Sequence, residues 1–343
     1  MGIRPWAVLL CVASMVGCQP AAAESPSPAP SAPTPITFRI DGEAPVIDPR
    51  DYGAAYLLPG ATVVLDGTMH LYAVAFFVDP SEPPRVLHLV SDDGVAWSGN
   101  AAASVLEDFP LELDGAGPVP SSAFVTDDGA WVMVGGGRLP TGDRPIIWRA
   151  SAPGPDGPWT AHPSPILEPA EDGWDTAIVD HPSIVSRADG ELMAYGGAAR
   201  GAPNRNRIGL ATSTDGVTWT RLEATMDGAD DARALGPDAC GIDARTMVEP
   251  HLLTVDGGHL LVFGVMAEGS DTDMRIVTAT SSDGGAWACA SGSGSLGSDD
   301  IPGRRSIHSF AVIDHPDGPP SLLIEVIGVE HSTLWLARAD DPR

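Results

Sequence analysis

One stretch of the chain, Ile208-Gly-Leu-Ala-Thr-Ser-Thr-Asp-Gly-Val-Thr-Trp-Thr-Arg-Leu222, joins a short apolar run to a polar turn and a tryptophan. The apolar run suits a buried strand. In the turn, the Asp215 side chain can accept backbone N–H bonds, and Gly216 tolerates a positive φ. Trp219 then gives the following strand a large apolar side chain. The stretch therefore predicts two strands joined by a tight corner.

The same corner recurs along the chain, and such recurrence is typical of a repeat architecture. The further copies are Ser91-Asp-Asp-Gly94 with Trp97, Ser281-Ser-Asp-Gly284 with Trp287, and a stretched version from Ser151 through Asp156-Gly157 to Trp159. These turns resemble the Asp-boxes of sialidase-like and related β-propellers. The resemblance implies that they hold blade corners and do not contact substrate.

A second repeated pattern lies upstream of each corner, and its copies are roughly 60 residues apart. It reads residue–Pro–residue, then an apolar strand, and in the four complete copies an Asp-Gly turn follows that strand. The copies are Leu58-Pro59-Gly60, Val119-Pro120-Ser121, His181-Pro182-Ser183, Glu249-Pro250-His251 and a degenerate Ile307-His308-Ser309.

The two patterns together predict an all-β fold, a five-bladed β-propeller with four antiparallel strands per blade, over residues 36–343. Abundant glycine and proline, 39 and 33 residues, punctuate short apolar runs, as expected for such a fold. The fifth unit ends without a tryptophan strand. We therefore expect Ile36–Ile40 to supply its outer strand and close the ring.

The N-terminal part of the chain has the composition of an export signal and a tether. Residues 1–18 carry Arg4, an apolar run and small residues before Cys18, which is typical of a secretory signal. Met15-Val-Gly-Cys18 resembles the bacterial lipobox, which implies lipidation of Cys18; an ordinary cleaved signal peptide is the alternative. Residues 19–35 are rich in Pro, Ala and Ser and predict an extended linker. The expected location is extracytoplasmic, anchored to a bacterial membrane through lipid alone, or else secreted.

Charge and cysteine content restrict the partners. The formal net charge of −27 disfavours nucleic acid and anionic lipid headgroups. Beyond the signal region only Cys240 and Cys289 remain, and in an oxidising compartment they predict a disulfide. Two free thiols are the alternative. We expect a monomer.

Ligands of β-propellers bind where the inner strands begin, so the proline corners should face one funnel. This brings together Asp180, His181, Glu249, His251 and His308, with Arg304 just before the last corner. Carboxylates and imidazoles that converge on a concave surface are the default hypothesis for a functional site.

The blades and proline corners resemble the five-bladed furanosidase-type propellers, which include glycoside hydrolase family 43, invertases and levansucrases. Similar segments are Gly173-Trp-Asp-Thr176 before Asp180-His-Pro-Ser183, and Arg207 to Gly216. The resemblance implies a base Asp, a helper Asp and an acid Glu on successive inner strands. Glu249 matches the acid segment and Asp180 falls near the helper. The base position holds Val119-Pro120, with Asp114 near it but not matching.

Three functions stay open. The first is a glycoside hydrolase that acts on a glycan in the funnel, with Glu249 and Asp180 catalytic and His181, His251, His308 and Arg304 as sugar contacts. The second is a non-catalytic cell-surface glycan-binding propeller. The third is a sialidase-like enzyme, because Phe38-Arg39-Ile40 resembles an opening arginine motif.

Neither a metal nor a cofactor is expected. The three histidines of the corners lie on different repeats and are interpreted as sugar-binding or strand-end residues. The acidic segments 227–231, 271–273 and 299–300 lack the alternating ligand spacing of a calcium loop and are interpreted as solvated turns.

Overall fold

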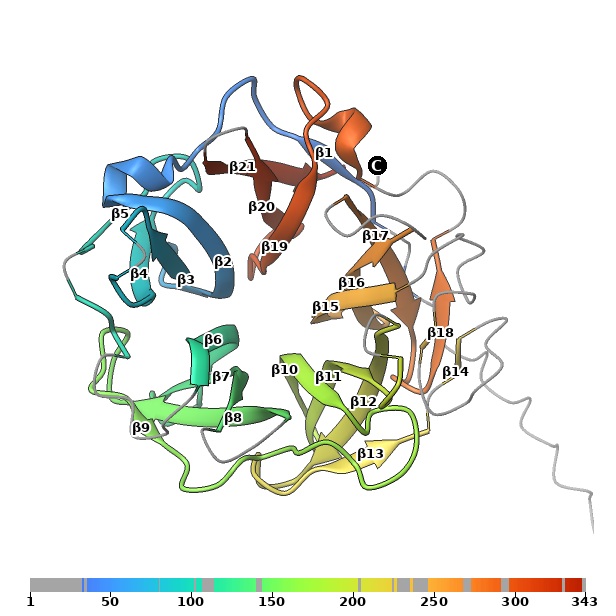
Figure 1. The fold of residues 1–343 in the computed structure, drawn as a ribbon. Helices are drawn as coiled ribbons and strands as arrows, with labels where there is room; N and C mark the ends of the chain where they lie inside the picture. The colour runs from blue at the N-terminus through green and yellow to red at the C-terminus, as the bar shows by residue number, and fades with distance from the viewer. Residues whose placement is uncertain are drawn as a thin grey trace, which may run out of the picture. The chain divides into compact units, whose positions relative to one another are not determined.

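The protein is an all-β propeller with five blades arranged around a centre, as the computed structural model shows (Figure 1). The fold prediction is confirmed. The chain divides into a unit Met1–Pro30 and a unit Ser31–Arg343. The structure describes residues 33, 36–79, 81–101, 103–106, 114–139, 144–202, 205–223, 225–226, 235–236, 246–267, 273–290, 296–328 and 331–340.

Each blade contains four antiparallel strands, the first of which lies innermost (Figure 1). The first blade contains β2 (Ala54–Leu65), β3 (Thr68–Phe77), β4 (Arg85–Ser91) and β5 (Ser98–Gly99). The second contains β6 (Asp114–Val125), β7 (Trp131–Arg138), β8 (Pro145–Ala152) and β9 (Thr160–Ala161). The third contains β10 (Ile178–Arg187), β11 (Gly190–Ala198), β12 (Arg207–Ser213) and β13 (Thr220–Leu222).

The fourth blade contains β15 (Thr246–Val255), β16 (Gly258–Met266), β17 (Met274–Ser281) and β18 (Ala286–Cys289). It carries one strand more than expected, because β14 (Thr225–Met226) pairs in parallel with β18. The fifth blade contains β19 (Ile307–Ile313), β20 (Ser321–Ile327), β21 (Ser332–Ala339) and β1 (Phe38–Ile40). Of the described residues, Pro49–Tyr52 (η1) and Ser298–Asp300 (η3) form short 3-10 helices in connections.

The N-terminal strand closes the ring, as the sequence predicts. Phe38 pairs with Ala339 and Ile40 with Ala337, so β1 is the outer strand of the last blade. The hydroxyl of Thr278 on the fourth blade donates a hydrogen bond to the carbonyl of Ile36 at 3.0 Å. The start of the described chain therefore contacts both of the last two blades.

The hydrophobic core is divided into clusters that lie between neighbouring blades. Between the third and fourth blades, Leu192 and Leu210 pack with Phe263 and Trp287. These four side chains are almost completely buried. Burial of such side chains contributes about 2 kcal/mol each, so each blade depends on its neighbours for its core.

The Ser-x-Asp-Gly turns are held by their own side chains. The Oδ1 atom of Asp215 accepts hydrogen bonds from the N–H groups of Val217 and Thr218, at 2.9 and 2.7 Å. The hydroxyl oxygen of Ser213 accepts one from the N–H of Gly216, at 2.8 Å. The bonds from Thr218 and Val217 stabilise the ionised carboxyl group of Asp215 and hold its pKa well below its usual range.

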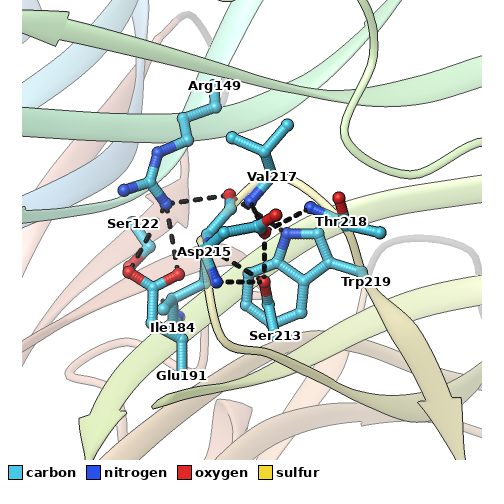
Figure 2. Close-up of polar contacts among 10 residues, drawn as sticks. Ser122, Arg149, Ile184, Glu191, Ser213, Asp215, Val217, Thr218 and Trp219 are labelled. Atoms are coloured by element: carbon cyan, nitrogen blue, oxygen red, sulfur yellow. Dashed lines mark hydrogen bonds and ion pairs between the residues drawn. The ribbon is translucent and has the colours of Figure 1, made fainter.

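The same turn also connects two blades (Figure 2). Arg149 of the second blade donates to the carbonyl of Gly216 at 3.1 Å and pairs with Glu191 of the third blade at 3.2 Å. Trp219 donates its indole N–H to the same Gly216 carbonyl at 3.2 Å. The turn is therefore a structural corner, which matches the role expected from the sequence.

The bonds of Asp215 recur around Asp93 and Asp283. The stretched copy differs, because Asp156 accepts a hydrogen bond from His88 of the first blade at 2.7 Å. His88 in turn contacts the ring nitrogen of His70 at 2.8 Å. In this copy the acidic side chain links two blades.

Several expectations concern residues outside the described ranges. They are the signal of residues 1–18 with Cys18, nearly all of the linker 19–35, Cys240, segment 227–231 and residues 271–272. Cys289 is described at the end of β18, but its predicted pairing with Cys240 stays a prediction. None of the described helices is long and apolar enough to cross a membrane.

Candidate functional site

A β-bulge interrupts every inner strand at the predicted proline corner. Such a bulge adds one residue to one strand and re-aims the side chains beside it. The register shifts lie between Pro59 and Ala61, Pro120 and Ser122, Asp180 and Ser183, Val248 and His251, and Ile307 and Ser309.

Strand register identifies which residues occupy equivalent places on the second, third and fourth blades. Val119, Asp180 and Val248 pair with Gly136, Gly196 and Gly264 on the neighbouring second strands. One residue further along the inner strands, the equivalent residues are Pro120, His181 and Glu249. Matching the repeats at their prolines, as the sequence suggested, is therefore wrong by one residue for the second blade. Asp180 and Glu249 are not at equivalent positions.

His181 and Glu249 share an uncommon backbone conformation. Their φ angles are 45° and 50°. A positive φ costs free energy for residues other than glycine, and such residues concentrate at functional sites. Each is followed by a proline, Pro182 or Pro250. Neighbouring blades thus hold two polar side chains in strained positions at the same level of the channel.

Asp180 lies against backbone that only glycine allows. A Cβ atom placed on Gly196 would lie 2.3 Å from the Asp180 Oδ1 atom, and one on Gly136 would lie 3.6 Å from its Cβ atom. The same Oδ1 atom is 3.4 Å from the His181 Nδ1 atom. The glycines therefore leave the space that the carboxyl group needs to face the imidazole.

Glu249 reaches from the fourth blade to the fifth. Its Oε2 atom accepts hydrogen bonds from the Ser309 hydroxyl at 3.0 Å and from the Phe310 N–H at 3.1 Å. Desolvation in the channel raises the pKa of Glu249, although the charge of His181 and these hydrogen bonds oppose the rise. A carboxyl group of this kind is suited to donate a proton.

The His181 imidazole is predominantly protonated at neutral pH. Desolvation lowers its pKa, but the carboxylates of Asp180 and Glu249 outweigh desolvation and raise the pKa to about 9. His181 is half-buried, with 35 % of its side chain exposed. The site thus combines two carboxyl groups with a cation that remains accessible.

His308 and His251 have opposite electrostatic surroundings. The buried Glu325 of β20 contacts the His308 Nδ1 atom at 2.9 Å, and this hydrogen bond raises the pKa of His308. Desolvation lowers the pKa of His251 to about 4. The Nε2 atom of His251 lies 3.2 Å from the Phe310 carbonyl oxygen, which can only accept, so Nε2 carries the proton of a neutral ring.

A small cavity of about 20 Å³ marks where these strands converge, and its lining includes His181, Glu249, His251 and Ser309. Arg304 is not brought to it: its side chain is 82 % exposed and lies 3.7 Å from Asp299. The predicted sugar contact by Arg304 therefore gains no support.

The opening arginine of the sialidase hypothesis also lies elsewhere. Arg39 is on the outermost strand of the last blade and pairs with Asp340 at 2.9 Å. This position is far from the inner strands, so the structure does not support a sialidase-like site built on Arg39. Among the described residues, no group of three or more His, Cys, Asp or Glu side chains is arranged to hold a metal ion.

Sequence reasoning missed the partners of the site, which are Glu325, Ser309 and the Phe310 N–H group. Ser309 follows directly after the degenerate corner, so the repeat could have drawn attention to it. Glu325 lies on a second strand inside the apolar run Leu322–Ile327. A single acid within a buried strand was the available signal for it, since such acids are rare unless paired.

The sequence matches no protein-family model and no curated protein. Solved structures share the fold. A protein described as a glycoside hydrolase superposes with a TM-score of 0.63 at 16% identity, over 91% of this chain and 93% of that chain. A family 117 glycoside hydrolase of the marine bacterium Zobellia galactanivorans gives a TM-score of 0.57 at 14% identity, over 90% and 93% of the two chains.

A family 32 beta-fructofuranosidase of Bombyx mori gives a TM-score of 0.60 at 14% identity. The match covers 88% of this chain but 61% of that one, so this chain spans about three fifths of it. These structural neighbours are glycoside hydrolase propellers. At these identities the likeness shows the five-bladed fold and assigns no activity to this chain.

Proposed function

We propose that the central site acts on a carbohydrate, as a glycoside hydrolase in which Glu249 is the proton donor. One observation carries the proposal: at the same bulge position on neighbouring blades, the chain holds the His181 imidazole and the Glu249 carboxyl group, with Asp180 3.4 Å from His181. The raised pKa of Glu249 supports its role as an acid. Glycoside hydrolysis requires a protonated acid near a second carboxyl group. The fold shared with glycoside hydrolases supports this assignment.

Each side chain has a separate role in this proposal. Glu249 protonates the leaving oxygen, and its raised pKa keeps a protonated fraction available. Asp180 accepts a hydrogen bond from a sugar hydroxyl or from the attacking water. His181 donates from its ring and, as a cation, stabilises the second carboxylate. His308, with Glu325 behind it, and His251 line the approach as sugar contacts.

A second candidate is glycan binding without turnover. Its supporting observation is the second blade, where the equivalent positions hold Val119 and Pro120. Neither side chain can activate water. A site that binds sugar through Asp180, His181 and Glu249 needs no base at that place, so the two candidates share their ligand and differ in turnover.

The substitution Glu249→Gln tests both candidates. Glutamine can still accept from Ser309 and Phe310 through its carbonyl oxygen, so the fold should survive, whereas the proton donor is lost. Turnover of a glycan panel should fall by about 10²–10⁴-fold. The exposed Glu223→Gln provides the matched control and should behave as the unmodified protein.

The outcomes separate the two functions. If no glycan is cleaved but one binds, and Glu249→Gln weakens that binding, the protein is a glycan-binding propeller. Full turnover by Glu249→Gln would remove the proposed acid. If no glycan of the panel binds and none is cleaved, a carbohydrate function is rejected.

We also propose that the protein is exported and anchored through lipid at Cys18, based on its lipobox-like segment and proline-rich linker. Cys18→Ala should move the protein from the membrane fraction to the soluble fraction. An unmodified protein that is soluble and carries no lipid mass would contradict this. According to this proposal, the propeller binds its glycan outside the cytoplasm and is a monomer.

A further inference from the structure

The channel contains a second and larger cavity, away from the acid of the proposed site. Its volume is about 260 Å³, against about 20 Å³ for the cavity beside Glu249. It is formed by the later halves of the inner strands. Ser186, Thr254 and Asp314 are exposed at its edge. The inner strands all run in the same direction along the channel. The cavity therefore opens at the rim of the channel where these strands end.

Hydroxyl groups of the inner strands line this cavity and retain hydrogen-bonding capacity. The Ser122 hydroxyl oxygen accepts from the Ile184 N–H at 3.3 Å, and that of Ser183 accepts from the Leu252 N–H at 2.8 Å. Each of these two hydroxyls therefore still has its own proton to donate. Thr62 donates to the Val312 carbonyl and can still accept.

The cavity is short of charge. Among the described residues that line it there is no lysine or arginine, and the titratable ones are His251 and Asp314. His251 is neutral, and its Nδ1 atom can accept because Nε2 donates to the Phe310 carbonyl. The overall charge of −27 disfavours anionic ligands. Of the residues described in the cavity lining, Asp314 is the one whose carboxyl group would attract a cation.

The cavity is distinct from the proposed catalytic site. Ser121 and His251 line both cavities, whereas Glu249 and His181 line the small cavity and not the larger one. Apolar side chains, including Phe124 and Leu252, complete the walls of the larger one. A ligand there would meet donors, acceptors and apolar surface without meeting the proton donor.

The volume of the cavity matches about one sugar unit. The volume corresponds to about eight or nine water molecules at ~30 Å³ each, and lies below the range of roughly 300–1,000 Å³ that is usual for drug-sized ligands. An uncharged molecule with many hydroxyls fits both this volume and the mixed donors and acceptors. We propose that this cavity binds a free, neutral monosaccharide or a polyol of the same size, separately from the glycan site.

The test uses the whole exported chain and a panel of free aldoses, with glucuronate and glucosamine as charged comparators. Saturation-transfer NMR and calorimetry measure binding. Thr254→Trp and Ser186→Trp each place an indole at the mouth of the cavity. Either should weaken binding of the neutral sugar by at least about tenfold. Thr160→Trp, the same change as Thr254→Trp on an exposed outer strand, should leave it unchanged.

Two further arms distinguish the cavity from the glycan site. Glu249→Gln should leave binding of the free aldose within about twofold, even if it abolishes binding or cleavage of the glycan. Crystals of the unmodified protein soaked in the bound aldose should show the sugar among Ser122, Ser183 and Thr254. The proposal is overturned if no aldose binds, if the charged sugars bind equally well, if neither tryptophan blocks binding, or if the crystals show water alone.

Discussion

His181 and Glu249 occupy the same place on adjacent inner strands, and the charge of each shifts the pKa of the other. The carboxylate of Glu249 helps to keep the imidazole protonated, and the imidazolium favours the ionised carboxyl group. Because both backbones are strained at this bulge, the surrounding sheet must hold the pair in place. The chemistry of the proposed site follows from this coupling.

His181 should make stability depend on pH on the alkaline side. Its folded pKa of about 9 lies above the ordinary value of 6.5. The stabilisation from its proton is therefore fully present below about pH 6.5 and is lost as the pH rises through about 9. Denaturant unfolding from pH 6 to 10 should show a falling free energy of unfolding, with a smaller fall in His181→Gln.

His162→Gln, which removes a histidine outside the channel, is the control for that experiment and should keep the slope of the unmodified protein. A direct check is the ¹⁵N NMR titration of the His181 ring. A midpoint near the ordinary value would show that Asp180 and Glu249 do not act on it.

Gly196→Ala should disturb the site through Asp180. The new Cβ atom would lie 2.3 Å from the Asp180 Oδ1 atom, so the carboxyl group must leave its present position beside His181. We expect the pKa of His181 to fall and the free energy of unfolding to decrease by about 1–3 kcal/mol. NMR titration and denaturant unfolding measure these effects.

Gly154→Ala is the matched control, because a Cβ atom at Gly154 meets no other atom within 4 Å. It should change neither quantity. An unchanged His181 titration in Gly196→Ala would show that Asp180 does not control the imidazole.

Phe38→Ala should weaken closure of the ring. Phe38 is 8% exposed and packs in the cluster between the fourth and fifth blades. Removal of its ring should lower the free energy of unfolding by about 3 kcal/mol. Arg39→Ala on the same strand should cost less than about 1 kcal/mol, because Arg39 is exposed and its ion pair with Asp340 is solvated. Equal effects of the two substitutions would contradict closure by apolar packing.

Cys240 and Cys289 should form a disulfide across a loop of about 50 residues. The chain-entropy estimate gives a stabilisation of about 4 kcal/mol for a loop of this length. Mass spectrometry of the exported protein without reduction should find the two cysteine peptides linked. Recovery of both as free thiols would reject the pairing.

The fold was predictable because its signals are local. Each Asp215-type turn and each proline corner is specified within a few residues, and the missing outer strand at the C-terminus indicated that Ile36–Ile40 completes the ring.

The site was predictable only in part. The structure places Asp180, His181, Glu249 and His251 near one another, but their register depends on bulges that proline spacing does not locate. Pairs such as His308 with Glu325 join different strands, so sequence spacing cannot specify them.

The pairing of Phe38 with Ala339 has a consequence for biosynthesis. During synthesis, the first strand of the propeller has no partner until almost the whole chain has left the ribosome, because its partner is the last strand. Contacts of such long sequence separation form slowly and late. A chain that is truncated before β21 would retain the first four blades. It would leave Phe38 without its partner strand and the last blade incomplete. Incomplete chains should therefore lack the contact that closes the ring.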